Sequence, residues 1–224
     1  MGQAKQRGTR DERIAQAQSR AKSDPAVSAA RANGTALPGS LQEAMQMSER
    51  FKQLIANLIT PSVVNAQVQQ FAQSLSNSAP IFLNCQPELW SRQSCCDTNV
   101  AKYIEEHGGQ MLCGYRIWYN EPLYIEGERH AVWTDGSHVR DVSFCATGET
   151  RILFAPDDRG FDNAPKKVRY AFEDADQQVL AQYETLERMV PHTQMSAEQA
   201  WATMLPYERW LAGARMRNLI QTFK

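Results

Sequence analysis

At Gly108-Gly109 the hydrophobic pattern of the chain changes from helical spacing to the pattern of strands. The apolar residues of 97–107 repeat every three or four positions, and a glycine pair is typical of a helix end. Short aromatic and β-branched runs then follow between 110 and 154, and the Asp135-Gly136 turn between two of them favours a hairpin. The centre of the chain is therefore predicted to be a helix followed by a small antiparallel sheet.

Amphipathic helical patterns flank this central unit on both sides, over residues 40–59, 63–75, 172–189 and 196–223. Helices on both flanks of a helix-then-sheet unit predict an α+β protein. We divide its 224 residues into four parts. These are a mobile basic arm (1–39), a helical N-terminal segment (40–78), a helix-plus-sheet core (79–158) and C-terminal helices packing on that core (159–224).

The charge of the chain gives little reason to expect a nucleic-acid partner. Its net charge is −1, although residues 1–34 carry seven Lys or Arg against three acidic residues, or +4. This arm has almost no large apolar side chains, so it cannot offset its ordering entropy by burial. At most we expect a weak electrostatic contact between the arm and an acidic partner or nucleic acid.

Cysteine usage predicts a soluble, cytoplasmic protein with free thiols. The chain has five cysteines, an odd number, and two of them are adjacent, which suits a disulfide framework poorly. The N-terminus lacks the apolar segment of a signal peptide, and no apolar stretch reaches the length of a membrane span. We expect no membrane partner.

Three residues of the central unit have the types and positions that thiol chemistry needs. Cys96 stands at the start of the predicted helix, where free N–H groups and the helix dipole stabilise a thiolate. His130 opens one predicted strand and Asp141 opens its neighbour across the hairpin, so the two side chains can meet. A nucleophile, a base and an orienting carboxylate are thus predicted in the order Cys, His, Asp.

The motifs of this unit resemble the transglutaminase-like branch of the papain superfamily and uncharacterised bacterial and phage proteins. They are Cys96-Asp97-Thr98-Asn99-Val100, Gly108-Gly109, Cys113-Gly114-Tyr115, His130-Ala131-Val132-Trp133, Asp135-Gly136 and Asp141. The resemblance implies a Cys-bearing helix packed on an antiparallel sheet. It also implies that Cys96 is the nucleophile, His130 the base and Asp141 the orienting group.

Neighbouring residues complete the predicted site. Gln93 is a candidate oxyanion donor just upstream of Cys96, and Asn99 falls one helical turn further on, where it could line the same mouth. Cys95 is the alternative nucleophile. The other three cysteines, Cys85, Cys113 and Cys145, are expected to be core residues.

The predicted function is a cysteine hydrolase or acyltransferase acting on an amide or thioester bond, such as a protease, deamidase or transglutaminase. We expect a protein or peptide substrate, no cofactor and no metal. Two alternatives remain open. One is a catalytically inactive protein of the same fold that binds a partner, and the other is a zinc-binding structural domain built from the cysteines and histidines.

Overall fold

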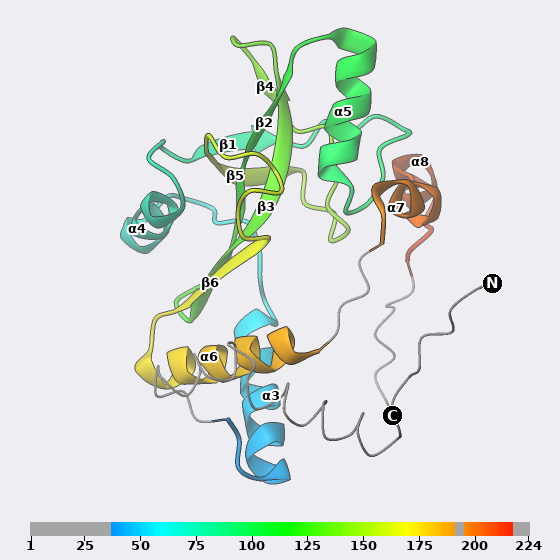
Figure 1. The fold of residues 1–224 in the computed structure, drawn as a ribbon. Coiled ribbons are helices and arrows are strands. Elements are labelled where there is room, and N and C mark those ends of the chain that lie inside the picture. Colours follow the sequence, from blue (N-terminus) through cyan, green and yellow to red (C-terminus); the bar gives the residue numbers. More distant parts are fainter. Residues whose placement is uncertain (1–36, 191–194, 217–224) are drawn as a thin grey trace, which may run out of the picture. The chain divides into compact units, whose positions relative to one another are not determined.

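The computed structural model describes residues 37–190 and 195–216 (Figure 1). The arm predicted over 1–39 therefore lies almost entirely outside the described residues. The described part contains six helices and six strands, which confirms the α+β class. In chain order they are α3 (Leu41–Ile55), α4 (Ala66–Leu75), β1 (Ile81–Asn84), α5 (Cys96–His107), β2 (Gln110–Asn120), β3 (Tyr124–Thr134), β4 (Val139–Arg140), β5 (Arg151–Pro156), β6 (Lys167–Ala171), α6 (Asp174–Met189), α7 (Ala197–Thr203) and α8 (Tyr207–Leu211).

The chain forms two compact units, and the smaller one contains α6 and the part of α3 up to Gln53. Within this unit the guanidinium of Arg50 pairs with both carboxylate oxygens of Asp176, at 2.7 and 2.8 Å. The rings of Phe51 and Tyr183 stack with centroids 3.6 Å apart. One ion pair and one aromatic stack thus join two helices that are more than 100 residues apart in the sequence.

The larger unit is built on one antiparallel sheet in which β2 and β3 pair along their full length of 11 residues each. The strand order is β1-β5-β2-β3-β4, and β6 also pairs with β3. Among the short runs between 110 and 154, the sequence pattern separates 124–128 from 130–133, but the structure joins them in the continuous strand β3. Residues on both faces of β3 are buried, so its sequence does not alternate between apolar and polar residues as that of a half-buried strand does.

The outer edge of β3, opposite β2, is shared by two short strands that leave a gap between them. β6 pairs with β3 as far as Glu128, and β4 pairs with it from Trp133 onward. His130 lies in this interval. In this interval the Arg129 N–H donates to the Lys166 carbonyl at 2.8 Å, and residues at the start of α5 and in the loop after Asp141 line one cavity with His130.

Two helices cover different parts of the β2–β3 ribbon. α4 packs through Val68, Phe71 and Leu75 on a cluster that includes Tyr115 and Ile117. α5 packs on the other end, where its apolar residues meet side chains of β2, β3 and the segment after β4. The residues of this second cluster are Val100, Tyr103, Ala131 and Val142, with Cys96, Met111 and Trp133 at its border. The Cys-bearing helix is therefore fixed against the strand that carries His130.

The chain after Pro156 differs from the sequence expectation in two places. No strand was expected between the polar stretch that ends at Lys167 and the helical pattern that begins at 172, but β6 lies there, and its Lys, Arg and Tyr residues obscure its strand character. The helical pattern expected over 196–223 is interrupted at Pro206, and its second part, α8, ends at Leu211, because Gly213 adopts a positive φ of 92° that stops it. Residues 217–223 lie outside the described residues. No helix in the described part of the chain has the length and apolar character needed to cross a membrane.

Candidate active site

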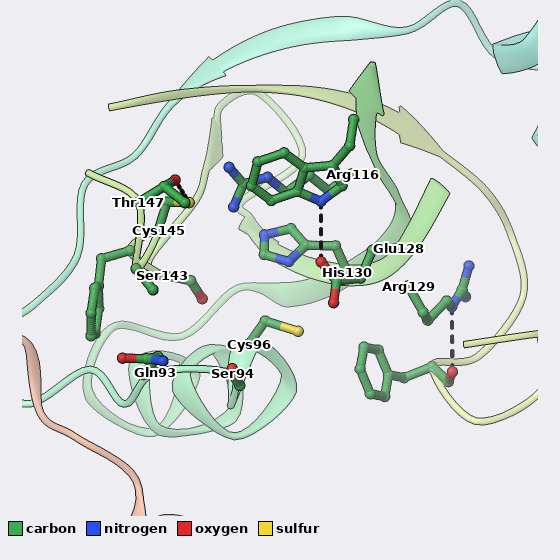
Figure 2. Close-up of a pocket in the computed structure, with 14 residues that line it drawn as sticks. Gln93, Ser94, Cys96, Arg116, Glu128, Arg129, His130, Ser143, Cys145 and Thr147 are labelled. Atoms are coloured by element: carbon green, nitrogen blue, oxygen red, sulfur yellow. Dashed lines mark hydrogen bonds between the residues drawn. The ribbon is translucent and has the colours of Figure 1, made fainter. Parts of the chain in front are cut away.

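Cys96 is the first residue of α5, and Cys95 occupies the preceding N-cap position. The Cys95 side chain makes no capping hydrogen bond, so the first-turn amides keep their partial positive charge available to a neighbouring anion. Cys96 is half-buried, and Figure 2 shows its thiol projecting from the helix start into a cavity. This is the placement that favours a reactive thiolate.

The segment before Cys96 is held in an unusual backbone conformation. Ser94 has φ of 58°, a left-handed conformation that costs a non-glycine residue about 1–2 kcal/mol. The buried side chain of Asn99 stabilises the segment by accepting from the Arg92 N–H at 2.7 Å and donating to the Arg92 carbonyl at 2.9 Å. The Gln93 N–H donates to the carbonyl of Leu205 at 3.0 Å. The strained backbone segment before Cys96 is thus held in place by hydrogen bonds to Asn99 and to Leu205.

His130 lies on β3 directly opposite Gly114 of β2. A side chain at position 114 would collide with the Ala155 carbonyl and the Phe154 ring, so glycine allows β5 to approach β2 closely here. The Phe154 ring meets the imidazole edge-on, with centroids 6.2 Å apart. The imidazole is therefore packed tightly and is 7% exposed.

Asp141 lies behind His130 and is almost fully buried. Its Oδ1 is 3.2 Å from His130 Nε2 and accepts a hydrogen bond from the Ser143 N–H at 2.9 Å. Its Oδ2 accepts from the Cys85 thiol, with sulfur and oxygen 3.7 Å apart. The contact with His130 has ion-pair distance but lacks hydrogen-bond alignment, so Nε2 has no hydrogen-bond partner in the described structure.

The surroundings of His130 favour its charged form. Burial of the ring lowers its pKa, but the Asp141 carboxylate and the Cys96 sulfur outweigh burial and raise the pKa to about 10. The Cys96 sulfur contributes to this rise after Asp141, and Cys96 and His130 line the same cavity. Because Nε2 faces Asp141, Nδ1 is the ring nitrogen left for the thiol. The charged form of His130, with the Asp141 carboxylate on one side of the ring and the Cys96 sulfur nearby, is therefore favoured at neutral pH.

Three other thiols of the central unit are held in their protonated form. Burial raises the pKa of Cys95 to about 11, with help from the nearby Asp97 carboxylate. Burial and then the Asp141 carboxylate raise the pKa of Cys85 to about 12, and burial also raises the pKa of Cys113. A thiol protonated at neutral pH is a poor nucleophile. These three cysteines are therefore disfavoured relative to Cys96.

The cavity in front of Cys96 and His130 has a volume of about 290 Å³. Aromatic side chains and polar groups alternate around it, as in many small-molecule and peptide sites. The lining residues are Gln93, Ser94, Cys96, Arg116, Trp118, Glu128, Arg129, His130, Ser143, Phe144, Cys145, Ala146, Thr147 and Phe161.

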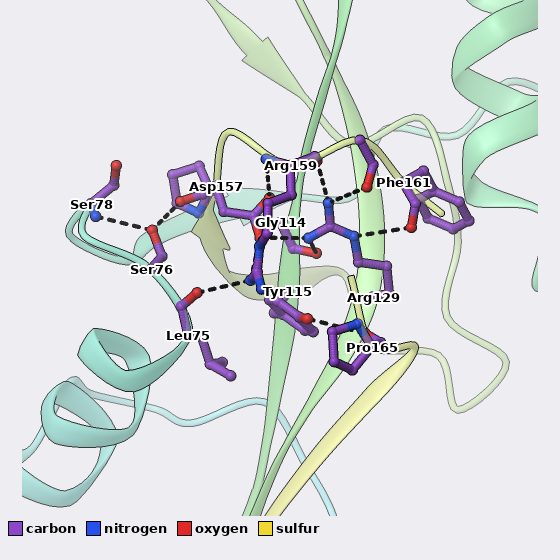
Figure 3. Close-up of polar contacts among 12 residues, drawn as sticks. Leu75, Ser76, Ser78, Gly114, Tyr115, Arg129, Asp157, Arg159, Phe161 and Pro165 are labelled. Carbon is purple, nitrogen blue, oxygen red and sulfur yellow. Dashed lines mark hydrogen bonds and ion pairs between the residues drawn. The ribbon is translucent and has the colours of Figure 1, made fainter. Parts of the chain in front are cut away.

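One wall of the cavity is fixed by the buried guanidinium of Arg129 (Figure 3). It pairs with Asp157 at 2.7 Å and donates to the carbonyls of Gly160 and Phe161, at 3.1 and 3.3 Å. These bonds tie the loop after β5 to the strand that bears His130. The ring of Phe161, which lines the cavity, is thereby held in place.

The structure brings four of the six predicted site residues together. Cys96, His130 and Gln93 line the cavity, and Asp141 contacts His130 from behind. Asn99 was expected to line the mouth and Cys95 was the alternative nucleophile, but neither lines the cavity. Asn99 uses both ends of its amide to hold Arg92, and Cys95 is 3% exposed behind the helix start.

Sequence reasoning missed the cavity residues Trp118, Glu128 and Ser143. For Glu128 a signal was present, because it precedes His130 by two positions and a strand places such residues on one face. Ser143 lies two residues after Asp141, but its place beside the cavity follows from the end of β4 at Arg140, which the sequence pattern did not predict.

Comparison with other proteins does not place the chain in a known family. No family model matches it, and neither a curated protein nor a solved structure matches it. Within residues 37–190 and 195–216, no three His, Cys, Asp or Glu side chains come together in a group that could hold a metal ion. The zinc-binding alternative therefore has no ligand set in that part of the chain.

Proposed function

We propose that this protein is a cysteine hydrolase or acyltransferase that acts on an amide or thioester carbonyl. The observation that carries the proposal is the convergence on one cavity of a helix-start thiol, a buried imidazole and a carboxylate 3.2 Å from that imidazole. The packing of the Cys-bearing helix on an antiparallel sheet supports a papain-like or transglutaminase-like core. Fold alone does not define an activity, so the proposal rests on the site.

In the first half of the reaction the Cys96 thiolate attacks the substrate carbonyl carbon. A carbon–sulfur bond forms, and the carbonyl π electrons move to oxygen, where the N–H of Cys96 and the side chain of Gln93 are the nearby donors. The His130 imidazolium then protonates the leaving amine or thiol as its bond to carbon breaks. The product is an acyl-enzyme in which the acyl group is a thioester of Cys96.

In the second half an acceptor removes the acyl group. The now neutral His130 takes a proton from water or from an amine as that group attacks the thioester carbonyl. The carbon–sulfur bond breaks and the Cys96 thiolate returns beside the imidazolium, which Asp141 stabilises throughout. Water as acceptor gives hydrolysis, and an amine gives acyl transfer.

Thiol labelling tests the proposal without knowledge of the substrate. With limiting iodoacetamide at neutral pH and mass-spectrometric peptide mapping, we expect Cys96 to be modified well before Cys85, Cys95 and Cys113. Cys95→Ser is the matched control, because it removes the adjacent thiol and should leave the rate at Cys96 unchanged. Equal rates at all five cysteines would contradict the proposal and favour a catalytically inactive binding protein.

A further inference from the structure

The cavity contains one carboxylate that no cationic side chain pairs with. Besides Cys96, four ionisable side chains matter here, namely Arg116, Glu128, Arg129 and His130. Three of them have a carboxylate within ion-pair distance: Arg116 has Glu149 at 2.9 Å, Arg129 has Asp157 at 2.7 Å and His130 has Asp141 at 3.2 Å. Glu128 is the fourth, and no cationic side chain among the described residues pairs with it.

The Glu128 carboxylate is held beside the reacting groups. Glu128 precedes His130 by two residues on β3, so both side chains project from the same face of the sheet. The indole Nε1 of Trp118 donates to Glu128 Oε2 at 3.2 Å, and this bond keeps the carboxylate over the cavity (Figure 2). Trp118 is itself fixed, because the Arg116 guanidinium stacks 3.7 Å from its ring centre. Glu128 Oε1 has no hydrogen-bond partner in the described structure.

A carboxylate in this position favours positively charged ligands over negatively charged ones. A ligand cation near Glu128 gains Coulomb energy and can donate to the free oxygen, whereas a ligand anion meets an uncompensated negative charge. Glu128 is solvent-accessible, so it stays hydrated until a ligand replaces the water. Each of the cationic side chains that line the cavity has a carboxylate within ion-pair distance, which weakens its effect on a ligand at Glu128.

We propose that Glu128 and Trp118 form a subsite for a protonated amine or a guanidinium on the substrate, next to the carbonyl that Cys96 attacks. This inference rests on the proposed function, since it names the substrate class of the same site. A lysine or arginine side chain of a peptide and a small cationic amine share this chemistry. In both cases the cation fixes the acyl group relative to the thiol.

Charged thiol reagents measure the subsite directly. The probes are 2-(trimethylammonium)ethyl methanethiosulfonate, which is cationic, and 2-sulfonatoethyl methanethiosulfonate, which is anionic. The measured quantity is the ratio of their second-order rate constants at Cys96, assigned by peptide mapping. We expect the ratio to favour the cation and to fall by roughly five- to tenfold in Glu128→Gln, the effect of one partly screened charge at close range. In Glu128→Lys the preference should reverse.

Glu105→Gln is the matched control. Glu105 is an exposed carboxylate on the helix that carries Cys96, outside the cavity, so its loss should leave the ratio unchanged. Peptidyl chloromethyl ketones with lysine or norleucine beside the ketone then identify the source of the cation. A Glu128-dependent preference for lysine assigns it to a peptide side chain, and a preference limited to the small reagent assigns it to a small amine.

The two proposals fail differently. If Cys96 reacts no faster than the buried thiols even with uncharged methyl methanethiosulfonate, the proposed function is wrong. If Cys96 reacts rapidly but the cation-to-anion ratio is the same in the wild type and in Glu128→Gln, the function stands and the cation subsite is refuted.

Discussion

Replacing Asp141 by asparagine removes one charge from the candidate triad and keeps the size of the side chain. The structure allows the consequence to be worked out. The pKa of His130 is about 10, against an ordinary value of 6.5, and this difference corresponds to about 5 kcal/mol in favour of the imidazolium. Burial opposes that preference and Asp141 is the largest contribution that supports it. Without the carboxylate, burial should dominate and the ring should be neutral at neutral pH.

A neutral ring no longer stabilises a thiolate at Cys96. The rate of Cys96 alkylation by iodoacetamide at pH 7 should therefore fall by about a hundredfold or more in Asp141→Asn. The fold should survive, because the asparagine side-chain oxygen can still accept from the Ser143 N–H. The assay is alkylation kinetics across pH, with far-UV circular dichroism and thermal melting as controls for folding.

Two outcomes would refute this reasoning. An unchanged alkylation rate would mean that Asp141 only packs against the sheet. A fall that accompanies partial unfolding would mean that its role is structural. The double variant with His130→Ala provides a further check, because groups that act as one unit give losses that do not add. Additive losses would require the triad assignment to be abandoned.

Two further predictions follow from the same contacts. The raised pKa of His130 contributes stability that is present below about pH 6.5 and is lost as pH rises toward 10. A Cys96 thiolate formed on folding would have the opposite effect in the same window, so the denaturant titrations use Cys96→Ser, whose unfolding free energy should fall between about pH 6.5 and 8.5 because Asp141 keeps the ring charged. The buried thiols do not interfere, since their protonated forms favour folding until above about pH 9. A flat profile, or an equal fall when Asp141→Asn is added, would contradict the assignment. Asn99→Ala should lower the unfolding free energy by about 2–3 kcal/mol, because it leaves the buried N–H and C=O of Arg92 without their partners. It should also slow Cys96 alkylation, since the strained conformation of Ser94 would be released. A stability loss with unchanged alkylation would show that the Asn99 hydrogen bonds do not position the thiol.

Much of the fold could be predicted because local pattern and tertiary environment agree in the central unit. The helix at 96–107 and the strand at 110–120 were expected within one residue at most ends, since the glycine pair separates two clear periodicities. β6 was not expected, because it gains its strand conformation from pairing with β3 and is rich in charged residues. Pairing partners distant in the sequence leave no local signal.

The candidate site shows the same division. Cys96, His130 and Asp141 could be chosen from residue type and element, because a helix start and a hairpin specify where side chains meet. The side chain of Asn99 could not be placed from the sequence, because a residue one helical turn after Cys96 can either line the cavity or be buried beneath it. Its true role depends on the path of residues 91–95, which the positive φ of Ser94 determines. A serine in the sequence does not indicate a positive φ, so this backbone conformation could not be predicted.

The imperfect contact between His130 and Asp141 is informative about how such a site works. Nε2 is buried without an aligned hydrogen-bond partner, which costs about 1–3 kcal/mol, and Ser94 adds backbone strain next to the thiol. Both costs lie within the cavity wall, while the surrounding groups, Arg129 and Asn99, are fully hydrogen-bonded. Catalytic hydrogen bonds are often poorly aligned before substrate binds and become aligned in the complex. A small rotation of the imidazole toward Asp141 would satisfy Nε2, so we expect an aligned contact between His130 and Asp141 in a substrate complex.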